Sequence, residues 1–111
     1  VVAHGNGTIA SDASEAKALS TVFQNNKVPV TAFKWSLGHT LAAAGIIETA
    51  MTLLALNENI VPKIGNLGNL APECQNLLLP KETLKLQHPV ALINSRGFAS
   101  VNATLIVSRS S

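Results

Sequence analysis

Two histidine residues, each next to a glycine, are the features of this sequence with the clearest chemistry. His4 begins the segment His-Gly-Asn-Gly-Thr, and His39 ends the segment Lys-Trp-Ser-Leu-Gly-His. Each histidine follows an apolar stretch, Val1–Ala3 or Val28–Phe33, where that stretch gives way to small residues. Catalytic and binding groups gather at strand ends in α/β proteins. We therefore expect both imidazoles, with the amine of Lys34, to form a site that polarises a substrate.

A single carboxylate lies inside the most apolar part of the chain. The pattern predicts a helix from about Thr40 to Leu56, covered by other layers because it is apolar on nearly every side. Glu48 lies in its middle, where an ionised, unpaired carboxylate would cost several kcal/mol. Lys34 is its candidate partner, although Glu48 could instead lie on a solvated face beside two threonines. Pairing would hold the ammonium near His39, lower the pKa of that imidazole and keep it neutral with one N–H to donate.

Other reactive groups in the chain lack the neighbours that their chemistry needs. His4, His39 and His88 have no metal-ligand spacing, so we predict no metal site. The loop of residues 5–8 lacks the lysine and the full glycine pattern of a phosphate-binding loop. Cys74 has no adjacent base, and no serine lies in a nucleophile-elbow sequence. We therefore predict that this chain contains no nucleophile.

The composition indicates a chain that contacts other protein over much of its surface. Hydrophobic residues make up 47% of its 111 residues, charged residues only 13%, and the mean hydropathy is +0.30. Average soluble domains contain roughly 25% charged residues. The length allows one domain at most. Because Val1–Ala3 has the pattern of a strand already under way, we expect a piece of a larger protein or a tightly held subunit.

Charge, cysteine content and helix length limit the cellular setting. The net charge of +2, without a cluster of basic residues or stacking aromatics, predicts no nucleic-acid partner. A single cysteine predicts a reducing compartment, so we expect a cytoplasmic protein. A helix over residues 41–56 would be about 24 Å long, short of the ~30 Å hydrocarbon core of a membrane. We therefore predict a buried helix and no membrane span.

The order of the elements predicts an α/β fold. Asp12 followed by Glu15 predicts a capping box at the start of a helix that ends at Phe23. A loop over Asn57–Glu73 follows the second helix. Apolar segments predict four strands: Val1–Ala3, Val28–Phe33, Val90–Asn94 and Val101–Val107. The order β-α-β-α-loop-β-β predicts layered helices on a mixed β-sheet.

Several of these segments together resemble a known family. From Val1 to about Arg109 the chain resembles the C-terminal half of the β-ketoacyl-(acyl-carrier-protein) synthases, the condensing enzymes of the thiolase fold. The resemblance rests on His4-Gly5-x-x-Thr8, Asp12 and Glu15, Lys34-x-x-x-Gly38-His39, Ala43-Ala44-Gly45 with Glu48, Pro72-Glu73-Cys74, and Asn94-Ser95-x-Gly97-Phe98 with Asn102. It implies that residues 1–111 are a thiolase-like C-terminal half-domain of a larger synthase, whose N-terminal half carries the nucleophilic cysteine.

The resemblance also implies an activity. The family performs a decarboxylative Claisen condensation of a malonyl-carrier-protein with an enzyme-bound acyl group, in fatty acid or polyketide synthesis. His4 and His39 would donate hydrogen bonds to the malonyl thioester oxygen and stabilise the enolate left after CO2 departs. Lys34, supported by Glu48, would organise His39. Alone, the chain would be inactive, since no thioester acceptor is present.

Four further residues match substrate-binding positions of the family. Asn6 and Thr8 match positions that contact the pantetheine arm of the carrier protein. Phe98, preceded by Gly97, matches the acyl-pocket gate whose backbone N–H joins the oxyanion hole. The resemblance implies no cofactor of its own, because the phosphopantetheine arm belongs to the acyl carrier protein. It implies as partners that carrier protein, the N-terminal half of the synthase and a second subunit in a homo- or heterodimer.

The chain departs from the family pattern at several positions, which keeps an alternative open. Asn6 replaces a threonine, Arg96 an aromatic residue, and Ala99-Ser100 a glycine pair, which should stiffen the last loop. Trp35 adds bulk to a turn that normally carries small residues. The alternative is a non-catalytic partner, similar to a chain-length factor, that pairs with an active synthase. A degradative thiolase is disfavoured, because residues 94–102 contain no cysteine.

Overall fold

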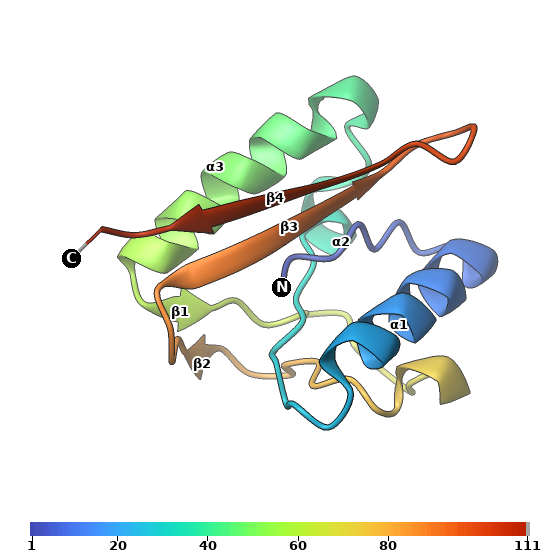
Figure 1. The fold of residues 1–111 in the computed structure, drawn as a ribbon, viewed down its shortest axis with the longest axis horizontal. Helices are drawn as coiled ribbons and strands as arrows, with labels where there is room; N and C mark the ends of the chain where they lie inside the picture. The colour runs from blue at the N-terminus through green and yellow to red at the C-terminus, as the bar shows by residue number, and fades with distance from the viewer. Residues whose placement is uncertain (111) are drawn as a thin grey trace.

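The computed structural model describes residues 1–110. Figure 1 shows its longest antiparallel strand pair crossing the middle of the molecule, and isolated parallel bridges extend this pair into a mixed β-sheet. Val2 pairs in parallel with Thr31 on one side and with Ile93 on the other. β3 (Val90–Arg96) continues the sheet into β4 (Asn102–Ser108), with which it pairs antiparallel along its whole length. At the other side of the sheet, Pro29 pairs in parallel with Leu78.

One helix covers each face of this sheet. Neighbouring residues of an extended segment point to opposite faces, so Val2 and Ala3 belong to different cores. Val2 packs with Phe33, Ile93 and, on α3 (Ala44–Asn57), Met51. Ala3 packs with Val30 and with Leu19 of α1 (Ile9–Phe23). The predicted fold class, helices layered on a mixed β-sheet, is confirmed.

Two predicted strands are shorter than the sequence indicated. Val1–Ala3 and Val28–Phe33 contribute single bridges to the sheet instead of continuous ladders. Pro29 has no N–H to donate, which interrupts the ladder of the second segment. The two C-terminal strands are instead slightly longer or shifted: β3 extends to Arg96, and β4 runs to Ser108.

The predicted capping box of the first helix is wrong. α1 begins at Ile9, and its N-cap residue Thr8 makes no side-chain capping hydrogen bond. The Asp12 carboxylate accepts from the Gly7 backbone N–H at 3.3 Å. The side chain of Glu15 turns away to the loop that carries His4. Both acidic residues therefore organise the preceding loop, and the helix starts one turn earlier than predicted.

The predicted long helix is divided, and its cover is incomplete. A short 3-10 helix, η1 (Leu41–Ala43), precedes α3. The buried side chains of α3 are Ala44, Glu48, Thr52 and Leu56. Ile46 is 70% exposed and Leu54 is 61% exposed. Residues 1–110 therefore cover one side of this helix, and the predicted layer on its other side does not come from these residues.

The segment predicted as a loop contains secondary structure. β1 (Ile60–Val61) pairs antiparallel with β2 (Leu84–Lys85), and η2 (Pro72–Cys74) lies against α1. Two-residue strands have no periodicity that the sequence could show. A one-turn helix, α2 (Lys34–Leu37), connects the second bridged segment to His39. Nowhere in residues 1–110 is a helix both long and apolar enough to cross a membrane.

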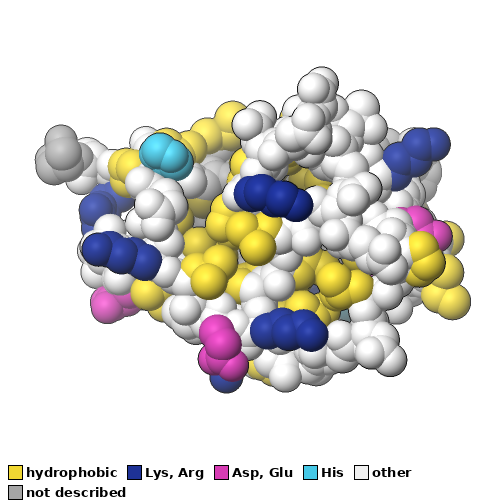
Figure 2. All heavy atoms as spheres, turned by 90° about the horizontal axis from the view of Figure 1, so that it is seen from below, with side chains coloured by type: hydrophobic (Ala, Val, Ile, Leu, Met, Phe, Trp, Pro, Cys, Tyr) yellow, Lys and Arg dark blue, Asp and Glu magenta, His cyan; other side chains and the backbone are white. Residues whose placement is uncertain are grey.

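The lower face of the molecule mixes charge with apolar surface. Figure 2 shows its basic side chains standing apart from one another, with hydrophobic side chains between them. In the described chain as a whole, Lys27, Lys63, Lys81 and Lys85 are exposed. A nucleic-acid-binding face would gather such charges into one patch. On this face, the low charge content of the sequence therefore appears as apolar side chains at the surface.

Candidate active site

The loop that carries His4 is held by a carboxylate from α1. The backbone N–H of His4 donates to Glu15 Oε1 at 2.9 Å, and that of Gly5 donates to Glu15 Oε2 at 3.0 Å. Gly5 has φ +45°, and a Cβ there would lie 2.9 Å from the Cβ of Ala32. Only glycine fits this position without displacement. Sequence reasoning missed the role of Glu15, because its spacing from Asp12 is equally typical of a helix start.

A buried ion pair supports the same loop from the other side. Lys34, the first residue of α2, pairs with Oε1 of Glu48 on α3. The burial of Glu48 in an apolar helix required such a partner. The Lys34 ammonium also donates to the backbone carbonyl of His4 at 2.6 Å. Among residues 1–110, the structure gives Lys34 no hydrogen bond to His39. The expectation that Lys34 organises His39 therefore differs from the observed contacts, which hold His4.

The two imidazoles lie together and share one tautomer. Their ring centroids are 5.4 Å apart, with the rings at 80° to each other. His4 Nδ1 accepts the backbone N–H of Arg96 at 3.2 Å, and His39 Nδ1 accepts that of Leu41 at 3.1 Å. In a neutral imidazole whose Nδ1 accepts, the hydrogen is on Nε2. Each ring therefore has an Nε2–H to donate.

The donor to His39 comes from a strained turn. Leu41 has φ +53°, which is rare for a residue with a branched side chain. Such conformations persist only where the surroundings hold them, and they cluster at functional sites. Here the turn brings the Leu41 N–H back onto the imidazole two residues earlier.

Burial and the charge of Lys34 both affect the protonation of His4. Burial is the larger cause and the Lys34 ammonium the next, and together they lower the pKa of His4 below its ordinary value of 6.5. The predicted effect of Lys34 on an imidazole thus falls on His4. A neutral His4 keeps its Nδ1 free to accept and its Nε2–H free to donate.

This pKa shift predicts how stability depends on pH. The folded state holds His4 neutral, so its contribution to the free energy of unfolding is complete above pH 6.5 and is lost as the pH falls through the lowered pKa. We expect an NMR titration of the His4 ring to have its midpoint below 6.5. Lys34→Met should raise that midpoint. A midpoint at or above 6.5 in the parent chain would contradict the assignment.

Both imidazoles face a cavity of about 640 Å³, and most of the predicted site residues lie around it. Its wall includes Asn6, Arg96, Gly97 and Phe98. The Phe98 side chain is 94% exposed, so it lies at the rim without closing it. Among residues 1–110, the Phe98 backbone N–H has no hydrogen-bond partner, whereas that of Gly97 donates to the Val101 carbonyl at 2.8 Å.

The two residues expected to contact the pantetheine arm contact each other. Asn6 Oδ1 accepts from both the backbone N–H of Thr8, at 3.0 Å, and its hydroxyl, at 2.9 Å. Both bonds lie at the surface. Asn6 lines the cavity, whereas Thr8 does not. The structure therefore places Asn6 at the cavity with the histidines, and Thr8 outside the cavity, where its two hydrogen bonds orient the Asn6 side chain.

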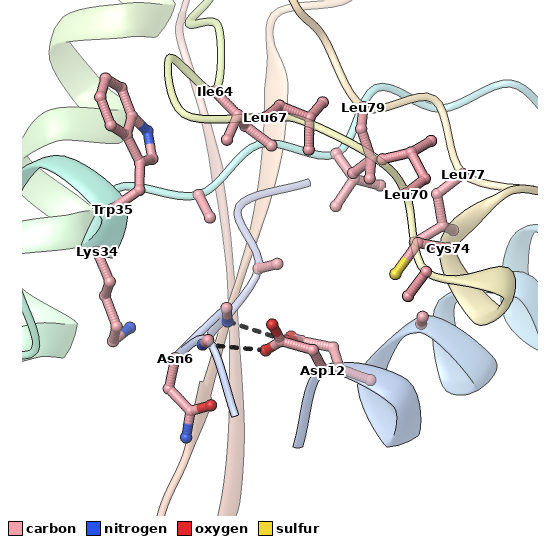
Figure 3. A pocket seen from close by; sticks show the side chains of 18 of the residues that line it. Asn6, Asp12, Lys34, Trp35, Ile64, Leu67, Leu70, Cys74, Leu77 and Leu79 are labelled. Carbon is pink, nitrogen blue, oxygen red and sulfur yellow. Dashed lines mark hydrogen bonds between the residues drawn. The ribbon is translucent and has the colours of Figure 1, made fainter. Parts of the chain in front are cut away.

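A second cavity of about 660 Å³ lies beside the first, between α1 and the segment before β2 (Figure 3). Asn6 and Lys34 lie at one end, and Cys74 lies at the other. Burial, with the nearby charges of Asp12 and Glu73, raises the pKa of the Cys74 thiol. The thiolate that a nucleophile needs is thereby disfavoured. Within residues 1–110, no three His, Cys, Asp or Glu side chains are grouped to hold a metal ion.

Trp35 forms part of the wall of this second cavity and lies on Gly65. A Cβ at position 65 would lie 2.4 Å from Trp35 Cη2, so Gly65→Ala must push the indole aside. Because the indole is 42% exposed and can turn outward, we expect a loss of about 1 kcal/mol or less and a red-shifted emission from the single tryptophan of the chain. Gly68→Ala, with nothing within 4 Å, is the matched control. Equal effects from both variants would contradict this packing.

Comparison with known proteins identifies the family. The family model described as the C-terminal domain of β-ketoacyl synthase matches residues 1–68. The chain therefore belongs to the β-ketoacyl synthase family, and matches its C-terminal domain. The chain is 37% identical over 109 residues to 3-oxoacyl-(acyl-carrier-protein) synthase 2 of Coxiella burnetii, covering 96% of this chain and 26% of that protein. It is 38% identical over 105 residues to the corresponding Synechocystis protein, covering 93% and 25%.

Known structures show the same fold. A β-ketoacyl synthase from Burkholderia phymatum superposes with a TM-score of 0.91 at 28% identity, over 99% of this chain and 27% of that one. The ishigamide ketosynthase/chain length factor superposes with a TM-score of 0.91 at 29% identity, over 99% and 28%. The fold is therefore the thiolase-like fold of ketosynthases, as predicted. The chain spans about a quarter of the length of the relatives it matches.

Proposed function

We propose that this chain supplies the histidine half of an active site for decarboxylative Claisen condensation. The observation that carries the proposal is the pair of neighbouring imidazoles, each with Nδ1 occupied by a backbone N–H and Nε2–H left to donate. Two donors beside one cavity suit a single oxyanion, such as the enolate that forms when a malonyl thioester loses CO2. Membership of the β-ketoacyl synthase family supports the same chemistry.

The mechanism assigns a separate task to each group. The Nε2–H groups of His4 and His39 would donate to the thioester oxygen, which becomes negative as the C–C bond to the carboxylate breaks. One aimed donor is worth roughly 3–4 kcal/mol to such a transition state. Lys34 and Glu48 would not touch the substrate. They would position His4, because Lys34 donates to the His4 carbonyl and Glu48 holds Lys34. The Phe98 N–H would serve the acyl thioester that the carbanion attacks.

The nucleophile would come from an N-terminal half that packs on α3. Ile46 and Leu54 expose most of their apolar surface on the side of α3 that the sheet does not cover. Burial of such surface is the main favourable term in association. We infer that the half with the nucleophilic cysteine covers this side, that the active protein is a homo- or heterodimer, and that this chain alone does not condense.

The substrate would arrive on an acyl carrier protein. One structural relative is a chain from the structure of a type II polyketide synthase acyl-carrier protein in complex with its ketosynthase bound to the hexaketide. It matches at 26% identity and a TM-score of 0.90, over 99% of this chain and 28% of that one. We infer the same class of partner here, with Asn6 in contact with the phosphopantetheine arm and no cofactor resident in this chain. A cytoplasmic location would suit that partner.

The experiment is a reconstitution assay with malonyl-carrier-protein. We expect no condensation product from the chain alone, and condensation with clear CO2 release once the half with the nucleophile is added. A chain-length-factor-like partner, which the altered loop at Arg96 and Ala99 favours, would instead yield condensation only with a third, active synthase. Absence of CO2 release in both arrangements would refute the proposed function.

A further inference from the structure

Arg96 joins three parts of the molecule at the mouth of the first cavity. It is the last residue of β3, and its backbone N–H donates to His4 Nδ1 at 3.2 Å. Its guanidinium donates from Nη1 to the Ser11 carbonyl at 2.9 Å and from Nη2 to Ser14 Oγ at 3.1 Å. Both serines lie in the first two turns of α1. One residue therefore connects the end of a hairpin, a helix and an imidazole.

A third bond fixes the guanidinium within the hairpin. Arg96 Nε donates to Oδ1 of Asn102, the residue opposite it at the start of β4, at 3.4 Å. A guanidinium is planar and presents its donors in a rigid fork, so three acceptors in different directions define its orientation. A lysine ammonium is a point charge on a flexible stem and cannot reproduce this geometry.

The loop that Arg96 begins has an unfavourable backbone. Ala99 has φ +54° and Ser100 has φ +61°, both in the left-handed region that disfavours residues with a Cβ. Gly97 N–H donates to the Val101 carbonyl at 2.8 Å and closes the loop. Non-glycine residues stay in such conformations only where neighbouring contacts hold them. Arg96 supplies contacts of that kind at the base of this loop.

We propose that Arg96 is a positioning residue that clamps the loop of residues 97–101 and the His4 ring to α1, so that the cavity beside both histidines keeps one fixed mouth. The evidence for the clamp is the four hydrogen bonds that Arg96 donates to His4, Asn102, Ser11 and Ser14. Its consequence rests on the proposed function: an acyl substrate would meet a loop backbone of constant shape at the entrance, with the Phe98 N–H held in one place. Substrate range would then be set by the fixed opening.

The test is hydrogen exchange and imidazole NMR on the 111-residue chain. In Arg96→Gln we expect the amides of Gly97 and Val101 to exchange about tenfold faster, as local opening becomes easier. The ¹⁵N shifts of His4 should change from one tautomer to a mixture of two. Arg96→Lys should behave as Arg96→Gln does, because charge without the fork does not restore the contacts.

Arg109 offers the matched control. It lies at the opposite end of the same hairpin and donates to the carbonyls of Leu56 and Asn57 at 3.3 and 3.4 Å. Arg109→Gln should leave loop exchange and the His4 tautomer unchanged. Ser14→Ala, which removes one acceptor, should speed the same loop amides by about two- to threefold, and it decides the question if Arg96→Gln does not fold.

Two results would overturn the clamp. One is unchanged loop exchange and an unchanged His4 tautomer in Arg96→Gln, or in Ser14→Ala where that variant decides. The other is faster exchange throughout the molecule, to the same degree as in the loop. Neither measurement involves condensation, so the clamp and the proposed function can fail independently of each other.

Discussion

His39→Ala should lower the rate of malonyl decarboxylation by about 10²–10³-fold in the reconstituted enzyme, the usual cost of losing one oxyanion donor. The reason is the Leu41 N–H bond, which fixes the His39 ring with its Nε2–H available. The effect should fall on kcat, because the donor strengthens only as negative charge develops. CO2 release from malonyl-carrier-protein, measured at saturating substrate, reports it directly.

A matched histidine variant separates this effect from general damage. His88 is exposed and lies outside both cavities, so His88→Ala should leave the rate unchanged. His4→Ala should lower the rate by a similar factor, and the double variant should cost less than the product of the two, because residues that act as a unit are not additive. An unchanged rate in His39→Ala would remove the catalytic role assigned to it.

Local patterns located the histidines because each follows an apolar segment and lies next to a glycine. The sheet then brings those segments together: Val2 pairs with Thr31, so the loops that follow both segments emerge at the same edge. The partner of Glu48 was also predictable, since a carboxylate in an apolar helix requires a cation. These inferences needed only the chemistry of single residues and the order of the strands.

What the sequence did not show are contacts made across the fold. Glu15 binds backbone N–H groups 10 and 11 residues away, and Arg96 holds a ring 92 residues away. Contacts between residues so far apart in the sequence leave no periodic pattern from which they could be predicted. The sequence also could not show which side of α3 is exposed. The helix is apolar on both sides, so its periodicity does not tell which side residues 1–110 cover.

The second large effect concerns stability. Glu48→Leu should lower the free energy of unfolding by about 3–5 kcal/mol, because it leaves the buried Lys34 ammonium without its carboxylate. Urea denaturation measures this loss. Glu58→Leu, at the exposed C-terminal end of α3, is the matched control and should stay within about 0.5 kcal/mol of the parent. A loss below about 1 kcal/mol in Glu48→Leu would show that the pair does not hold the fold.

The double variant Lys34→Met with Glu48→Leu shows why the pair is present. Glu48 Oε2 is buried and has no hydrogen-bond partner in residues 1–110, so the pair does not fully offset the cost of its own burial. Replacing both charges by apolar side chains should therefore recover most of the stability lost in Glu48→Leu. It should not recover decarboxylation, because the His4 carbonyl loses the ammonium that holds it. Stability regained without activity would assign the ion pair to the placement of His4, whereas recovery of both would make it a structural pair alone.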